Sequence, residues 1–168
     1  LEISKNLTIK GKGAAAALNA NSNHSGTVPA DAPPTKHRIF KVASGKTLTL
    51  QDLKLKGGMA GSHDPSDPLA SSGGAIRLNG GSASLSNVNI SGCKAITTGG
   101  CTGQGGGIYA KDGGTLTLND STIKDCEATV SGGGIYATGG TINLTGCTIT
   151  GNKANNGGGI RLYKSGGG

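Results

Sequence analysis

The chain has 168 residues, a formal net charge of +7 and 33 glycines. The glycines follow no three-residue period, which excludes collagen. One Phe and no Trp exclude a core built on large aromatic side chains. No run of 18 apolar residues occurs, so we expect no segment to cross a bilayer as a helix. These features predict one domain with a core of Leu, Ile, Val and Ala.

Residues 1–45 are the irregular part of the sequence. The apolar residues near the start predict an incomplete first coil of strands: Leu1, Ile3, Leu7 and Ile9. Residues 21–37 are rich in Asn, Pro and Ser, so we expect an excursion loop there. Apolar and polar residues alternate again over residues 38–42, which predicts a strand.

Residues 46–163 contain a regular repeat. Each unit carries three apolar residues in the same relative places: Leu48, Leu50 and Leu55; Ala83, Leu85 and Ile90; Leu116, Leu118 and Ile123; Ile142, Leu144 and Ile149. Each unit also ends in a Gly-rich motif followed by Ile, and successive Ile residues are 32, 27 and 25 positions apart: Ile76, Ile108, Ile135 and Ile160. The apolar spacing within a unit is two, which is the period of a strand.

These repeats predict an all-β fold, a right-handed parallel β-helix (a pectin-lyase-like solenoid) of about five coils. Each coil has three short strands separated by Gly and Asn turns, and stacked coils bury the apolar columns. We expect Leu85, Leu118 and Leu144 to share one buried column, and the four repeat Ile residues to share another. Residues 57–72 contain two Asp-Pro pairs and predict a second excursion loop. We interpret residues 1–168 as one module and as a piece of a longer chain.

The Gly-rich motif and a second four-residue motif alternate in fixed register. Residues 73–76 read Gly-Gly-Ala-Ile, the other three copies read Gly-Gly-Gly-Ile, and residues 149–152 read Ile-Thr-Gly-Asn. Cys replaces the last Asn at Cys93 and Cys126. Over residues 46–163 this pattern resembles the polymorphic outer membrane protein repeat family, the GGAI and FxxN repeats of bacterial autotransporter passengers. The resemblance implies a β-helix, export and adhesion to host cells.

One column of large polar and aromatic residues follows the inward Ile of each coil. It consists of Arg77, Tyr109, Tyr136 and Arg161. Strand alternation predicts that all four point outward and stack on one another. The column is our candidate binding surface for a host-cell protein or a glycan. It also fits a structural ladder held by cation–π contacts.

Cys93 and Cys126 occupy one column in adjacent coils. Neighbouring strands lie about 4.8 Å apart, within the Cα separation that a disulfide tolerates. The pair fits a disulfide and fits two buried free thiols equally well. Cys93 paired with Cys101 across a short turn is the other possible disulfide.

Two carboxylates are the best case for an enzyme. Asp52 and Asp120 occupy equivalent turn positions two coils apart, with Asn87 between them and Gly146 next along. A separation near 10 Å is close to that of inverting glycosidases, so a β-helical polysaccharide lyase or glycoside hydrolase is the alternative function. Asp and Asn are also ordinary turn residues, and we predict no catalysis, no cofactor and no metal.

The remaining features add no stronger prediction. The spacings of His24, His37 and His63 match no zinc motif. The Gly triple at 132–134 precedes no helix, so turn glycines explain it better than a phosphate site. An array of outward Thr and Ser fits an ice-binding protein, although it is interrupted. The scattered basic residues predict no nucleic-acid binding.

We therefore expect a non-catalytic, surface-exposed or secreted bacterial β-helix module. Its role is that of an adhesin or autotransporter passenger, acting as a stiff spacer that presents the loops 21–37 and 57–72. We expect no membrane insertion by this segment, and flanking coils of the same parent chain are further partners. The expected location is the bacterial cell surface, the outer membrane or the medium.

Overall fold

The computed structural model describes residues 1–12, 16–19, 37–61, 66–67 and 69–163. The regular secondary structure in these residues is entirely β. The strands are β1 (Glu2–Ile3), β2 (Leu7–Lys10), β3 (Ala17–Asn19), β4 (Phe40–Val42), β5 (Thr47–Lys56), β6 (Met59–Ala60), β7 (Ile76–Asn79), β8 (Ser82–Ser91), β9 (Lys94–Ala95), β10 (Ile108–Lys111), β11 (Thr115–Asn119), β12 (Thr122–Lys124), β13 (Glu127–Ala128), β14 (Ile135–Thr138), β15 (Thr141–Thr145), β16 (Thr148–Thr150) and β17 (Ile160–Tyr163). In the described part of the chain, no helix has the length and apolarity needed to span a membrane.

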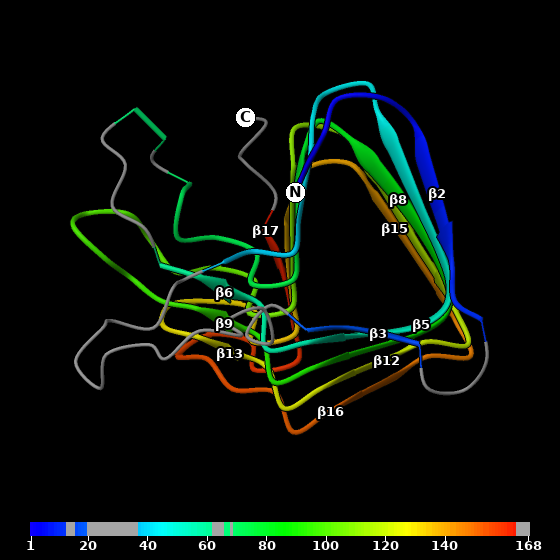
Figure 1. Ribbon diagram of the computed structural model, residues 1–168. Coiled ribbons are helices and arrows are strands. Elements are labelled where there is room, and N and C mark those ends of the chain that lie inside the picture. The colour runs from blue at the N-terminus through cyan, green and yellow to red at the C-terminus, as the bar shows by residue number, and fades with distance from the viewer. Residues whose placement is uncertain (13–15, 20–36, 62–65, 68, 164–168) are drawn as a thin grey trace, which may run out of the picture.

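The strands form three parallel sheets that wind into a triangular solenoid (Figure 1). Sheet A has the order β1-β4-β7-β10-β14-β17 and forms one wall. Sheet B contains β2, β3, β5, β8, β11, β12, β15 and β16, and it bends to form the other two walls. Sheet C is a narrow sheet of β6, β9 and β13 that lies outside the triangle. The expected parallel β-helix of about five coils is confirmed, and β17 begins a further turn.

The two walls of sheet B meet at a sharp corner in each coil. At this corner the backbone of Asp52, Asn87 and Asp120 has φ values of 54°, 52° and 48°, and Gly146 has 62°. Asp, Asn and Gly are the residues that enter this left-handed region most readily. A left-handed backbone at each turn position therefore makes the corner between the two walls.

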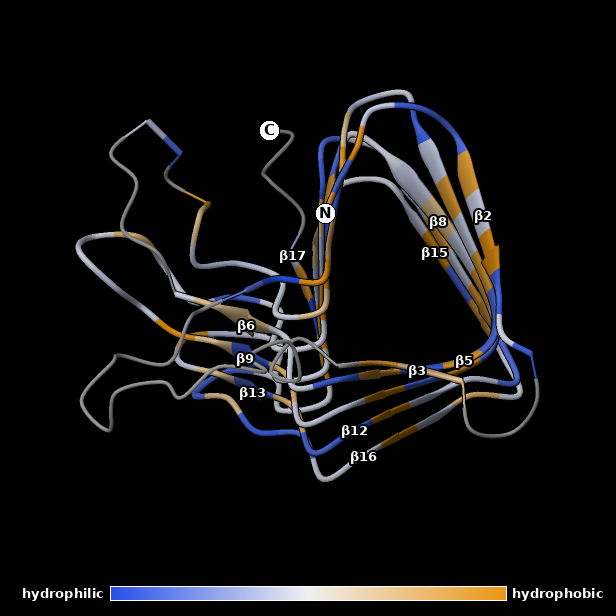
Figure 2. Cartoon of the chain, in the orientation of Figure 1, coloured by the Kyte–Doolittle hydropathy of each residue, from blue (hydrophilic) through white to orange (hydrophobic). Residues whose placement is uncertain are grey.

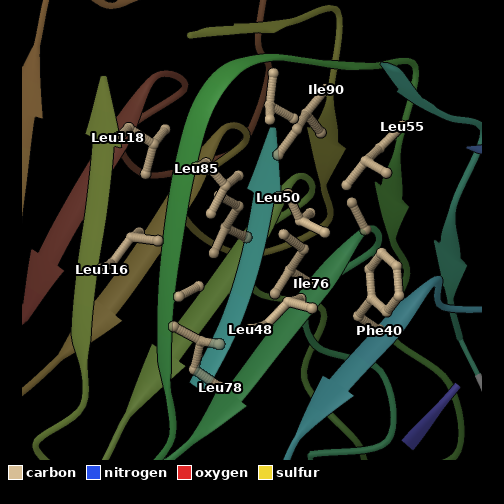
Figure 3. Close-up of a cluster of buried hydrophobic side chains, with 14 of the residues drawn as sticks. Phe40, Leu48, Leu50, Leu55, Ile76, Leu78, Leu85, Ile90, Leu116 and Leu118 are labelled. Atoms are coloured by element: carbon tan, nitrogen blue, oxygen red, sulfur yellow. The ribbon is translucent and has the colours of Figure 1, made fainter. Parts of the chain in front are cut away.

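The register of the sheets agrees with the repeat in the sequence. Leu50 pairs with Leu85, Leu85 with Leu118, and Leu118 with Leu144. Apolar and polar residues alternate along the strands, and the apolar ones fill the inside of the triangle (Figures 2 and 3). Burying a Leu or Ile in this way is worth roughly 1.5–3 kcal/mol.

Both predicted columns exist, and both end at a partly exposed residue. Leu85, Leu118 and three of the repeat Ile residues are fully buried, whereas Leu144 and Ile160 are each 36% exposed. These two residues belong to the last described coil, so they are covered on one side only. The N-terminal segment also joins the solenoid, because β1 and β2 pair in register with β4 and β5. Leu1 is the exception, being 71% exposed.

The two predicted excursion loops have different outcomes. Residues 21–36 lie outside the described residues. The second loop, 57–72, contains a strand that we did not predict, because β6 pairs with β9 in sheet C. A two-residue strand is too short to show alternation in the sequence, and its inward residue, Ala60, is small.

The glycine motif lets adjacent coils approach closely. Gly132 has a φ of 64°, as expected of a turn glycine. A Cβ atom at Gly133 would collide with the carbonyl oxygen of Gly158 in the next coil. The backbone N–H of Gly134 donates to Gly158 at 3.0 Å, so the motif continues the hydrogen-bond ladder through the turn.

Leu118→Asp should unfold the protein, because it places an unpaired charge in the dry core. Thr117→Asp should leave the melting temperature nearly unchanged, because Thr117 points out of the triangle and is not buried. Thermal unfolding followed by circular dichroism compares the two variants. Equal losses of stability would contradict the finding that Leu118 points into the core and Thr117 points out of it.

Candidate functional site

The outer face of the second wall of sheet B is built from polar side chains. Strand alternation turns Leu55 and Ile90 inward and leaves two rows of polar residues outside. In one row Lys54 pairs with Asn89, which pairs with Thr122. The other row consists of Lys56, Ser91 and Lys124.

Two hollows lie on this face and together form one groove. The first has a volume of about 620 Å³ and is lined by Asp52, Asn87 and Asp120 among others. The second has a volume of about 550 Å³ and includes all three lysines of the face and Asp125. Lys54 and Asn89 line both hollows. We call the combined feature the polar groove.

A ladder of turn residues forms one rim of the polar groove. Asn87 Nδ2 donates a hydrogen bond to Asp52 Oδ1 at 2.8 Å. Asp120 continues the ladder in the next coil. Its Oδ1 lies so close to Gly146 that a Cβ atom at that position would collide with it. The predicted equivalence of these four turn positions is confirmed. The amide of Asn87 separates the two carboxylates and bonds directly to one of them.

Asn89 lies in the middle of the groove and has an unsatisfied acceptor. Its Oδ1 atom is buried and has no hydrogen-bond partner among the described residues. A buried acceptor without a partner costs about 1–3 kcal/mol.

The column of Arg77, Tyr109, Tyr136 and Arg161 is in register, as predicted. The four residues pair successively across sheet A, and the two tyrosine rings stack at 5.5 Å with an angle of 4° between their planes. The prediction that the column is exposed was wrong for three of its members. Arg77 and Tyr109 are 2% exposed and Tyr136 is 7% exposed, while Arg161 is exposed.

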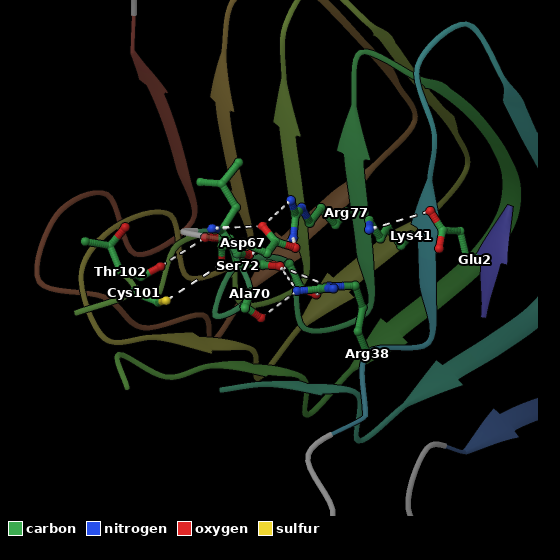
Figure 4. Close-up of polar contacts among 11 residues, drawn as sticks. Glu2, Arg38, Lys41, Asp67, Ala70, Ser72, Arg77, Cys101 and Thr102 are labelled. Carbon is green, nitrogen blue, oxygen red and sulfur yellow. Dashed lines mark hydrogen bonds and ion pairs between the residues drawn. The ribbon is translucent and has the colours of Figure 1, made fainter. Parts of the chain in front are cut away.

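The column is covered because the chain passes back over sheet A after leaving sheet C. Arg77 makes two bonds to Asp67, at 2.7 and 2.8 Å, and one to the carbonyl oxygen of Leu69 at 3.0 Å (Figure 4). Cys101 also approaches this segment, with its Sγ 3.8 Å from the carbonyl oxygen of Asp67. The column is thus a buried ladder over most of its length, and Arg77, Tyr109 and Tyr136 cannot form the exposed binding surface that we expected.

Two arginines anchor the covering segment to sheet A. Arg38 donates to the carbonyl oxygens of Ala70 and Ser72, each at 2.7 Å (Figure 4). Burial, together with repulsion from Arg77, lowers the pKa of Arg38 to about 10. The hydrogen bonds from Arg77 lower the pKa of Asp67 below its usual value. Burial raises the pKa of Tyr109 to about 12.

Cys93 and Cys126 lie side by side as free, buried thiols. The flanking pairs in sheets B and C place them in equivalent positions of adjacent coils. Each thiol donates to a carbonyl oxygen two residues earlier, that of Ser91 at 3.4 Å and that of Lys124 at 3.3 Å. The neighbouring Cys126 thiol and burial both raise the pKa of Cys93. The disulfide between them stays a prediction.

The histidines and the Thr and Ser array form no further candidate site among the described residues. His37 is exposed, and His24 and His63 lie outside the described residues. Among the residues with described positions, no three His, Cys, Asp or Glu side chains could hold one metal ion together. The Thr and Ser array lies on the first wall of sheet B, where Thr49, Ser84 and Thr117 pair in register.

Sequence reasoning missed the lysines and Asn89 of the polar groove. Each is an ordinary outward residue of a strand, and the rows become visible only after the register is known. The signal available in the sequence was their position two or four residues beyond the Asp and Asn turn residues.

A family model described as the right handed beta helix region matches residues 71–168, more than half of the chain. The protein therefore belongs to the right-handed β-helix family, which confirms the predicted fold class. No curated protein and no solved structure matches the chain.

Asp67→Asn should lower the free energy of unfolding by about 3 kcal/mol, because Arg77 would then be a buried charge without its carboxylate partner. The depressed pKa of Asp67 also predicts the pH dependence. The ion pair stabilises the native protein fully above about pH 4, and its contribution is lost as pH falls through the native pKa. Urea unfolding between pH 7 and pH 2 measures both effects.

Glu127→Gln is the matched control, because Glu127 pairs with Lys94 at the surface, where both side chains are about half exposed. This variant should change stability by less than about 1 kcal/mol. Equal effects of the two substitutions would contradict the anchoring role of the Asp67–Arg77 pair.

Proposed function

We propose that the protein is a non-catalytic, secreted or surface-displayed module that binds an extended acidic polysaccharide in the polar groove. The observation that carries this proposal is the pair of adjacent hollows that share Lys54 and Asn89 and are lined mainly by polar and charged side chains. The bacterial cell surface, the adhesin or passenger role and the closer kinship to polymorphic outer membrane protein repeats belong to the same proposal.

The chemistry of the groove favours a polyhydroxylated ligand over a protein. Protein recognition sites depend on buried aromatic and aliphatic anchors. The groove lining contains no aromatic residue and is mostly polar, with Ala16, Leu53 and Val88 as its aliphatic members. Asn and Asp side chains along the rim can bond to sugar hydroxyls, since they supply both donors and acceptors. The coils repeat about every 4.8 Å, a spacing similar to the length of one sugar unit in an extended polysaccharide.

The charges of the second hollow favour an acidic group of the ligand there, whereas Asp52 and Asp120 line the first hollow. Lys54, Lys56 and Lys124 line one hollow together with the single carboxylate of Asp125. Lysine ammonium groups bind carboxylate or sulfate groups through charge-assisted hydrogen bonds. The net charge of +7 also attracts a polyanion at long range.

The non-catalytic part of the proposal rests on the rim. Asp52 and Asp120 line the same hollow, but Asn87 lies between them and bonds to Asp52. We therefore assign these side chains to the turn ladder and to ligand binding. A polysaccharide lyase or glycoside hydrolase remains the alternative that the activity measurement below would reveal.

The test is calorimetric titration of the 168-residue protein with heparin, polygalacturonate, alginate and, as a neutral control, xylan. We expect binding to at least one acidic polymer that weakens as salt is added. The variant Lys54→Gln/Lys56→Gln/Lys124→Gln should bind it at least about tenfold more weakly, since each lost charged hydrogen bond is worth about 1 kcal/mol or more. No product should form with any of the polymers.

The matched control is Lys5→Gln/Lys46→Gln/Lys111→Gln, which removes the same charge from positions outside the groove lining. This variant should keep most of the affinity. Equal losses in both variants, or no binding to any acidic polymer, would overturn the proposed groove function. Turnover that disappears in Asp52→Asn would replace it with the enzyme alternative.

Both thiols are buried in the native protein, so oxidised glutathione should join Cys93 and Cys126 when it is present during refolding from urea, with two thiols oxidised and two glutathione molecules released as thiols. Alkylation and peptide mass analysis would identify the bond, and Cys126→Ser should prevent it. Alkylation of both Cys93 and Cys126 after the treated protein is unfolded would show that the pair stays reduced.

A further inference from the structure

Charged side chains on the second wall of sheet B and at its corners occur in alternate coils. Four successive coils contribute the equivalent segments 52–57, 87–92, 120–125 and 146–151. Segments 87–92 and 146–151 contain no charged residue. The other two segments hold the charges of this wall in these coils: Asp52, Lys54, Lys56, Asp120, Lys124 and Asp125. Charge therefore recurs with a period of two coils.

The row of side chains along the second hollow shows this period in register. Lys56 pairs with Ser91, and Ser91 pairs with Lys124. Thr150 takes the same position in the following coil. Two strand steps of about 4.8 Å place the backbones of the two lysines about 10 Å apart.

The second hollow runs along the solenoid axis. It is lined by Lys56, Ser91 and Lys124, which belong to three successive coils. An extended polysaccharide in this hollow advances by about one sugar unit for each strand step of about 4.8 Å. Two sugars of such a chain would face a lysine, and the sugar between them would face Ser91.

The ammonium groups of the groove are available to a ligand. Within the described part of the chain, the lysines that make ion pairs are Lys41, Lys94 and Lys111, and none of the three groove lysines does so. The carboxylate of Asp125 lies against Gly151 in the next coil. An acidic group of a ligand therefore competes with no ion pair inside the protein.

The uncharged coil of β8 suits a neutral sugar. Asn89 and Ser91 line the second hollow at this level, and both side-chain types can donate and accept hydrogen bonds. A carboxylate there would face no cation, and charged donors hold a carboxylate more strongly than neutral ones. The rim carboxylates of Asp52 and Asp120, in the coils on either side, would repel it. An unpaired charge of this kind discriminates against the wrong ligand.

We propose, building on the groove function stated above, that the ligand is a polysaccharide in which acidic and neutral sugars alternate. The carboxylates of its acidic sugars lie beside Lys56 and Lys124, and the neutral sugar between them lies beside Asn89 and Ser91. A polymer with a carboxylate on every sugar binds more weakly, although it carries more charge.

The test compares oligosaccharides of equal length by calorimetric titration of the 168-residue protein at one salt concentration. Hyaluronan and unsulfated chondroitin oligosaccharides carry a carboxylate on every second sugar, whereas oligogalacturonate carries one on each sugar. We expect at least one alternating oligosaccharide to bind about tenfold more tightly than oligogalacturonate. Attraction by net charge alone predicts the opposite order, because oligogalacturonate is the stronger polyanion.

The outcomes separate this proposal from the groove function on which it rests. Equal affinities, or tighter binding of oligogalacturonate, would overturn the alternating ligand and leave an acidic-polysaccharide groove in place. Binding of heparin or alginate without binding of either alternating oligosaccharide would have the same meaning. Failure of every acidic polymer to bind would overturn both proposals.

Ser91→Lys places a cation in the uncharged coil. This variant should lower the ratio of hyaluronan affinity to oligogalacturonate affinity about tenfold, because the intervening carboxylate then gains a charged partner. Ser84→Lys is the matched control, since Ser84 belongs to the same strand, β8, but lies on the first wall of sheet B. The control should keep the ratio of the unmodified protein. An unchanged ratio in Ser91→Lys, or equal changes in both variants, would contradict the proposed register, and circular dichroism checks that both are folded.

Discussion

The structure depends on one constraint, which is that every coil must place equivalent residues at the same point along the solenoid axis. Parallel strands that pair at about 4.8 Å bring each side chain against its counterparts above and below. Leu85 packs between Leu50 and Leu118 for this reason. A shift of one residue in any coil would exchange the buried and exposed faces of its strands, so the register is strongly specified.

The corners obey the same constraint with polar residues. Asp52, Asn87 and Asp120 each bend sheet B through a left-handed backbone, and the same stacking that fills the core brings their side chains into a ladder. The rim of the polar groove is therefore a by-product of folding. Under the proposed function, a ligand in the groove would contact groups that the turn already requires.

The sequence predicts the coils, the columns and the stacking of Tyr109 on Tyr136, because all of these follow from period-two alternation within a repeat. It fails for the surroundings of that column. Sheet C consists of two-residue strands with small inward residues such as Ala95 and Ala128, which leave no periodic signal. The return of the chain over sheet A depends on Asp67 reaching Arg77. The polar groove escapes prediction because its lysines become neighbours only through the register.

The successive repeat Ile residues are 32, 27 and 25 positions apart, yet sheets A and B keep one register throughout. Most of the extra residues lie where the chain travels from sheet C back to sheet A, as in the loop that holds the bridge between Thr98 and Cys101. Another lies in the turn from sheet A to sheet B, since Leu116 follows Ile108 by eight residues whereas Ala83 follows Ile76 by seven. These two junctions are where a gene encoding this fold can gain or lose single codons without shifting the columns of the core.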